Sequence, residues 1–135
     1  MNPGIIWVHN DRNNAPRLYA LNQQGKTVGT YVLDAFGPDG TMAGDWEDMA
    51  RVPKSDGTFD LYIGDIGNNA MATKEHEILV VSEPKVDAAE SAEILGLPFK
   101  RIRFRYPDGY ACNSECLMVN PLSKEIVIIS KSQNR

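Results

Sequence analysis

The sequence lacks several features that mark common classes of protein. Over its 135 residues, no apolar run approaches the roughly 20 residues that cross a bilayer. The formal net charge is −4, and no block of like charge is longer than Lys100-Arg101. Duplex nucleic acid and anionic membrane surfaces both bind clustered positive charge. We therefore expect neither a membrane span nor a nucleic-acid partner.

Cysteine is scarce as well. The two cysteines, Cys112 and Cys116, lie four positions apart. Along one strand that spacing corresponds to about 13 Å, whereas a disulfide joins Cα atoms within about 7 Å of each other. No His or further Cys lies near enough in the sequence to complete a zinc site. Both thiols are therefore predicted to be small side chains of the core.

Familiar catalytic motifs are also missing. Ser114 lies outside any Gly-x-Ser-x-Gly segment, the elbow that exposes a nucleophilic serine. The segment Gly64-Asp65-Ile66-Gly67 has no following lysine, so it does not form a phosphate-binding loop. His76 lies in a polar stretch that we expect to be a loop, and it is given no function. Serine-hydrolase and nucleotide-binding mechanisms of these kinds are not expected.

What the chain does contain is a series of short apolar runs. Hydrophobic residues make up 42% of the chain and charged residues 24%, the balance of a folded globular protein. Residues 87–95, rich in Ala and Glu, are expected to be a loop with one helical turn at most. β-Branched and aromatic residues between turn-forming segments predict an all-β fold. The expected strands are residues 5–9, 17–21, 27–33, 46–52, 59–64, 77–82, 99–106, 115–119 and 125–130.

One pattern recurs along the chain. Glu47 and Glu115 each precede an apolar strand, a short turn and a second apolar strand, and they lie 68 residues apart. Residues 7–11 and 62–65 form a second echo, in which an aromatic-aliphatic pair runs towards an Asp. Recurrence of a strand group at such a period indicates a repeat architecture. For strands, that architecture is the β-propeller, built from four-stranded antiparallel blades.

The strand pattern predicts only part of such a ring, about two to two and a half blades. Residues 1–35 would supply the second to fourth strands of one blade, residues 45–106 a complete blade, and residues 112–135 the first two strands of the next. A closed propeller needs about four blades at least, so open sheet edges remain that invite pairing. Either flanking sequence completes the ring, or copies of the chain associate to close it.

Four ordered motifs carry a resemblance to a known family. They are residues 9–11 (His-Asn-Asp), 45–50 (Asp-Trp-Glu-Asp-Met-Ala), 61–69 (Leu-Tyr-Ile-Gly-Asp-Ile-Gly-Asn-Asn) and 113–116 (Asn-Ser-Glu-Cys). In this order they resemble a family of bacterial β-propeller proteins, mostly of unassigned function. The resemblance extends over nearly the whole chain. It implies a propeller fold and an exported protein.

The chain departs from that family at two places. Asn68 stands where the family usually has Asp, and Asn113-Ser114 replaces Asp-Ala, so both changes reduce negative charge. Residues 1–4 carry no basic segment or cleavage site, so no secretory signal is predicted and the localisation is left open. More distantly, the arrangement is similar to calcium-dependent lactonase and phytase-like propellers, whose acidic and amide groups hold a metal. That second likeness is an analogy between folds.

The recurring acidic residues predict a calcium site. Innermost strands line the channel of a propeller, and Glu47 and Glu115 begin such strands. Asp11 and Asp65 end second strands, and Asn68 follows in a loop at the same face. Carboxylate and amide oxygens are the ligands that calcium prefers. A cation there would polarise an ester, lactone or phosphate for hydrolysis, with Asp65 as ligand or general base.

Structural roles compete with each of these assignments. Asp11 is a common turn former, Asp65 can hold loop amides, and a Glu at the head of a strand is often only solvated. His9 fits a structural role, Trp46 and Tyr62 fit packing between blades, and Asp48 fits a partner for backbone groups. The chain is then a non-catalytic propeller that binds a small molecule, a glycan or a protein partner, or a module that assembles through blade edges. The sequence does not decide whether the protein is an enzyme.

Overall fold

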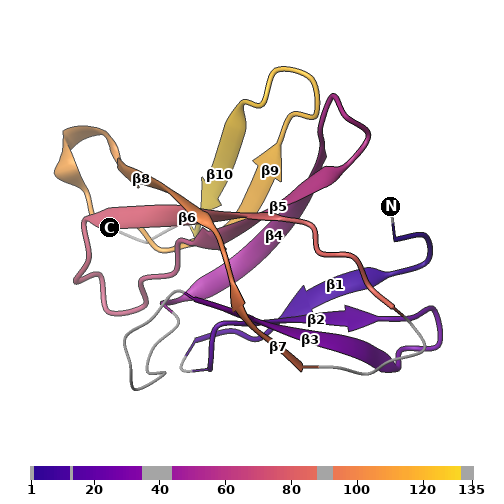
Figure 1. Ribbon diagram of the computed structural model, residues 1–135. Helices are drawn as coiled ribbons and strands as arrows, with labels where there is room; N and C mark the ends of the chain where they lie inside the picture. Colours follow the sequence, from indigo (N-terminus) through magenta and orange to yellow (C-terminus); the bar gives the residue numbers. More distant parts are fainter. Residues whose placement is uncertain (1, 13, 35–43, 88–92, 132–135) are drawn as a thin grey trace.

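The computed structural model describes residues 2–12, 14–34, 44–87 and 93–131. These residues form ten β-strands in three sheets and one 3-10 turn, η1 (Pro107–Gly109), with no α-helix among them (Figure 1). The all-β prediction is confirmed. Within the same residues, no helix is long and apolar enough to cross a membrane.

The first sheet, sheet A, is formed mainly by the N-terminal part of the chain. Its first three strands run antiparallel to one another, and the fourth lies parallel to the third. Between the second and third strands, the Asn22 Oδ1 atom accepts hydrogen bonds from the backbone N–H of Gln24 and of Lys26, which closes the turn. In order across the sheet, the strands are β1 (Ile6–His9), β2 (Arg17–Leu21), β3 (Thr27–Leu33) and β7 (Glu93–Leu97).

Sheet B is antiparallel throughout, and sheet C is a two-stranded ribbon. The turn between the first two strands of sheet B ends at Gly57, which has a φ of 80°. In order, sheet B contains β4 (Trp46–Pro53), β5 (Phe59–Asp65), β6 (Glu75–Ser82) and β8 (Lys100–Arg105), and sheet C contains β10 (Ile126–Ser130) and β9 (Ser114–Val119).

The prediction for residues 87–95 was wrong where the structure describes them. Instead of a loop or helical turn, Glu93–Leu97 form strand β7 beside β3, and residues 88–92 lie outside the described part of the chain. Asp34 N–H donates to the Leu97 carbonyl at 3.1 Å, and Arg17 and Glu93 form an ion pair at 3.2 Å. Pairing with the edge of β3 gives this segment backbone hydrogen bonds, and that pairing outweighs the local preference of Ala and Glu for a helix.

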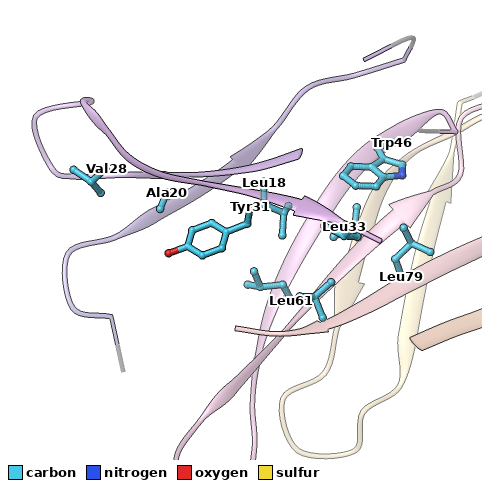
Figure 2. Close-up of a cluster of buried hydrophobic side chains, with 10 residues drawn as sticks. Leu18, Ala20, Val28, Tyr31, Leu33, Trp46, Leu61 and Leu79 are labelled. Carbon is cyan, nitrogen blue, oxygen red and sulfur yellow. The ribbon is translucent and has the colours of Figure 1, made fainter. Parts of the chain in front are cut away.

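Sheet B is the central layer, because each of its faces packs against another sheet. On one face, Leu18 and Tyr31 of sheet A meet Trp46, Leu61 and other apolar side chains of sheet B (Figure 2). On the opposite face, Ile66 and Ile78 meet Leu117 of β9 and other residues of sheet C. Trp46 is 1% exposed, in keeping with the packing role predicted for it.

The three sheets do not close into a ring within the described residues. The propeller arrangement therefore stays a prediction. Cys112 and Cys116 are both free and partly buried.

Candidate functional site

Glu47 occupies an irregularity in strand β4. Trp46 pairs with Asp65 of β5, but the next pair along the ladder is Asp48 with Gly64. One residue of β4 is therefore extra, and that residue is Glu47. An extra residue of this kind is a β-bulge, which bends the strand and redirects a side chain.

Glu115 occupies the same kind of irregularity in β9. Cys116 pairs with Ile129 of β10, and the next pair is Ser114 with Ser130, so Glu115 is skipped. The two glutamates that the sequence repeat singled out are thus both bulge residues, one in sheet B and one in sheet C. The repeat in sequence corresponds to a repeat in backbone geometry.

Asp48 ties the two bulged strands together. One carboxylate oxygen, Oδ2, accepts a hydrogen bond from the backbone N–H of Leu117 in β9 at 2.8 Å. The other, Oδ1, accepts from the N–H of Met49 at 2.8 Å. Asp48 therefore serves backbone groups, as the sequence predicted, and it holds the middle of β9 against β4.

Four carboxylates meet where these strands begin. One oxygen each of Asp11, Asp45 and Glu47 lies within 4.8 Å of the others, and Glu115 is close enough for its charge to act on Glu47. We call Asp11, Asp45, Glu47 and Glu115 the acidic cluster. Asp11 follows β1 and Asp45 precedes β4, so the cluster draws on all three sheets.

A glycine makes room for this arrangement. A Cβ atom built on Gly67 would lie 2.3 Å from Glu47 Oε1 and 2.5 Å from Asp45 Cγ. Both distances are far below van der Waals contact, so any side chain at position 67 would displace the two carboxylates. The loop after β5 therefore approaches the acidic cluster with its bare backbone.

The charges of the acidic cluster are only partly compensated. Burial and the negative charges of Glu115, Asp11 and Asp45 together raise the pKa of Glu47 to about 7, while Lys131 opposes them. The Lys131 Nζ atom lies 2.5 Å from Glu115 Oε1. The Oδ1 atom of Asp45 is shielded from solvent and accepts no hydrogen bond from any described residue. The cluster thus has oxygen atoms to spare for a cation.

Asp65 lies beside the acidic cluster but outside it. Its Oδ1 atom accepts a hydrogen bond from the backbone N–H of Asp45 at 2.7 Å. Burial raises the pKa of Asp65 to about 6, although that hydrogen bond acts in the opposite direction. Asp65 and Asp45 both line a cavity of about 400 Å³, together with Arg12, Asn68 and other residues. The cavity and the cluster therefore share Asp45.

Asn68 holds the loop that follows β5. Its side-chain oxygen accepts hydrogen bonds from the N–H groups of Ala72 and Thr73, and its Nδ2 donates to the Thr73 carbonyl at 2.7 Å. Its own backbone N–H donates to Asn113 Oδ1 at 2.6 Å. The structure does not bring Asn68 into the acidic cluster. An amide suits this position because a carboxylate could not donate to the Thr73 carbonyl.

Both histidines pack against aromatic rings. The ring of His9 meets the ring of Trp46 edge-on, with centroids 5.8 Å apart. The expectation that His76 lies in a polar loop was wrong. His76 lies in β6, only 4% exposed, against Phe104 and Tyr106. Burial lowers the pKa of the His76 imidazole.

Of the residues predicted from sequence, the structure brings Asp11 and Glu47 together and adds Asp45, which the prediction did not include. Glu115 lies near enough for its charge to act on Glu47. Asp45 belongs to the same Asp-Trp-Glu-Asp segment as Glu47, and this neighbourhood was the available signal. Comparison of the chain with protein-family models, curated proteins and solved structures found no match. The family resemblance therefore stays a prediction, and a function has to be argued from the geometry.

Proposed function

We propose that the acidic cluster binds a divalent cation, with calcium as the best fit. The observation that carries the proposal is the approach of Asp11, Asp45 and Glu47 oxygens to within 4.8 Å of one another. Asp11 lies far from Asp45 and Glu47 in the sequence, so no local turn explains how it meets them. Calcium takes about six to eight oxygen ligands in flexible geometry, and carboxylates from several strands can supply a large share of them.

Electrostatics supports the same choice. Carboxylates that face one another destabilise their ionised forms, and a cation between them removes that cost. Asp45 Oδ1 has no hydrogen-bond partner among the described residues, although a buried polar atom normally has one. A bound cation would satisfy it. Gly67 supports the proposal too, because it leaves space that the two carboxylates occupy.

The architecture that we propose around this site is a partial propeller. Residues 1–35, 45–106 and 112–135 would be its three blade portions, except that β7, within 45–106, pairs with the first of them. The antiparallel sheet β4-β5-β6-β8 supports the proposal, because a blade is a four-stranded antiparallel sheet. The acidic cluster would then lie at the channel, where β1 ends and β4 and β9 begin.

The adjoining cavity suggests what a bound cation would do. A substrate in that cavity would lie between the cation and Asp65, because Asp45 belongs to both places. The cation would polarise an ester, lactone or phosphoryl oxygen. Asp65, with a pKa of about 6, would be ionised at neutral pH and able to accept a proton from water. Hydrolysis is thus the reaction class that we propose for this site.

A purely structural cation is the competing function, and one observation favours it. Asp65 Oδ1 already accepts the Asp45 N–H, so this carboxylate also serves to hold the strand end. In that case the cation joins three sheets and the cavity binds a ligand without chemistry. Both versions require the cation, and only the first requires turnover of a substrate.

Thermal melting tests the shared requirement. A ligand that binds only the native state raises the melting temperature as its concentration rises. We expect calcium chloride to raise the midpoint over that in a chelator, and Glu47→Gln to abolish the increase. Glu125→Gln, an exposed acid beyond the cluster, is the matched control and should retain it. An unchanged midpoint in the unmodified protein contradicts the proposed cation site.

Turnover separates the two versions. If the site is catalytic, model esters, lactones or phosphate esters should be hydrolysed in calcium, and Asp65→Asn should abolish hydrolysis while the calcium shift persists. A calcium shift with no hydrolysis of any of these substrates supports the structural cation instead.

Assembly through open sheet edges remains a further candidate, supported by the surface of sheet C. Val127 and Ile129 of β10 and Met118 of β9 are each about half exposed, at 49%, 50% and 47%. An edge strand with apolar, uncharged residues invites pairing with another chain. Light scattering tests this: association requires a mass above the 15.0 kDa of one chain, and a monomer at all concentrations contradicts it.

A further inference from the structure

Lys131 places a positive charge at the acidic cluster. It directly follows β10, and its backbone N–H donates to the Asn113 carbonyl at 2.8 Å, which fixes the start of its side chain. The Nζ atom then lies 2.5 Å from Glu115 Oε1. The end of one strand of sheet C thus delivers an ammonium group to the bulge residue of the other.

The influence of this ammonium group extends beyond Glu115. The hydrogen bond to Glu115 and the charges of Glu115, Glu47 and Asp11 all raise the pKa of Lys131. In return, Lys131 acts against the rise in the pKa of Glu47. Lys131 is therefore protonated at neutral pH and interacts with three of the four carboxylates of the cluster.

We propose that Lys131 is a built-in competitor of the divalent cation: its ammonium group engages Glu115 while the cluster is empty and releases Glu115 when the cation binds. This inference rests on the proposed cation site and describes how the affinity of that site is set. It predicts that Lys131 keeps the affinity lower than the carboxylates alone would give.

The contacts of Lys131 suit such an exchange. The Glu115 Oε1 atom is shielded from solvent, but the side chain of Lys131 is 52% exposed, so water can solvate the ammonium group when it leaves. Lysine carries a compact charge on a flexible stem, so the ammonium group can swing into solvent without moving the strand. A divalent ion brings twice the charge of the ammonium group and would be repelled by it across the cluster. Removing the lysine charge should therefore tighten cation binding by about tenfold.

Calorimetric titration with calcium chloride, at fixed pH and ionic strength, tests the inference. We expect Lys131→Met to bind calcium about tenfold more tightly than the unmodified protein, and Lys131→Arg to bind within about twofold of it. Lys26→Met, a control that removes a lysine from the turn before β3, should leave the affinity unchanged. A gain in affinity separates competition from a structural role, because loss of a structural contact would weaken binding. Lys131→Gln serves in place of the Met variant if that variant does not fold.

The results of these titrations separate the role of Lys131 from the existence of the cation site. Equal or weaker calcium binding by Lys131→Met and Lys131→Gln overturns the role of Lys131 and leaves the cation site standing. Absence of calcium binding in every variant overturns both. In a protein that already carries Glu115→Gln, Lys131→Met should raise the calcium affinity by less than it does in the unmodified protein, because the two residues act as a pair. An undiminished gain in that double variant would contradict competition at Glu115.

Discussion

Two neighbouring residues at the start of strand β4 illustrate opposite ways of building a protein interior. The first, Trp46, is packed into the apolar core between sheets A and B, where Leu61 and Leu79 are fully buried (Figure 2). One residue later, Glu47 belongs to a group of carboxylates that repel one another. The core is stable because water is excluded from it. The acidic cluster persists although its charges oppose it.

The stability of the fold resides in the apolar core, and the proposed function resides in the acidic cluster. Apolar burial fixes the strands, and their fixed positions force the carboxylates together. Conditions that change charge should therefore act on the acidic cluster and leave the core unaffected.

Truncation of a core side chain should lower the free energy of unfolding strongly, and calcium should not change the size of that loss. Leu61→Ala removes buried methyl groups and should lower the free energy of unfolding by about 2–5 kcal/mol. Urea unfolding in calcium and in chelator measures the loss. The loss should be the same in both, and a loss that depends on calcium would show that core and cluster are coupled.

Gly67→Ala tests the cluster by crowding it. The new methyl group would lie within 2.3 Å of Glu47 Oε1, so the carboxylates must move and the calcium-induced rise in melting temperature should vanish. Ala70→Ser, at an exposed position in the same loop, is the control. Retention of the full calcium shift by Gly67→Ala would contradict the geometry of the site.

Asn68→Asp distinguishes a loop-holding residue from a ligand. The substitution removes the donor to the Thr73 carbonyl and should reduce the unfolding free energy by about 1–2 kcal/mol. Because Asn68 lies outside the acidic cluster, the calcium shift should stay. A marked change in calcium affinity, measured by titration, would restore Asn68 as a ligand.

The pH dependence of stability gives the smallest effect. The pKa of Glu47 is about 7 in the fold against 4.5 for an unperturbed glutamate, so between these values the folded protein holds more protons than the unfolded chain. Without calcium, stability should therefore fall as the pH rises from about 4.5 to about 7, by about 1 kcal/mol after allowance for solvent screening. Glu47→Gln should flatten that slope in melting experiments at constant ionic strength. Calcium affinity should rise over the same pH range, because the cation displaces the Glu47 proton.

The strands were predictable because alternation and turn residues are local signals. All nine expected strands occur, whereas β7 was missed because its reason to exist is an edge of β3 far away in the sequence. His76 was misplaced for a related reason: its aromatic neighbours come from other segments. Local composition says little about which distant segment will need a partner.

The candidate site was predictable where the sequence repeats itself. Glu47 and Glu115 stood out because each precedes an apolar strand, and both proved to be bulge residues. The place of Asp45 could not be derived, since it depends on where β1 ends relative to β4. The hydrogen bond from the Asn68 side-chain amide to the Thr73 carbonyl could not be predicted either, because hydrogen bonds within loops leave no periodic pattern in the sequence.

The central claim is that a cation binds among Asp11, Asp45 and Glu47. Anomalous X-ray diffraction from crystals grown in calcium chloride tests it most directly. We expect an anomalous peak at about 2.3–2.6 Å from oxygens of these three side chains. Well-ordered carboxylates with no peak between them, at a calcium concentration that saturates any thermal shift, would contradict it.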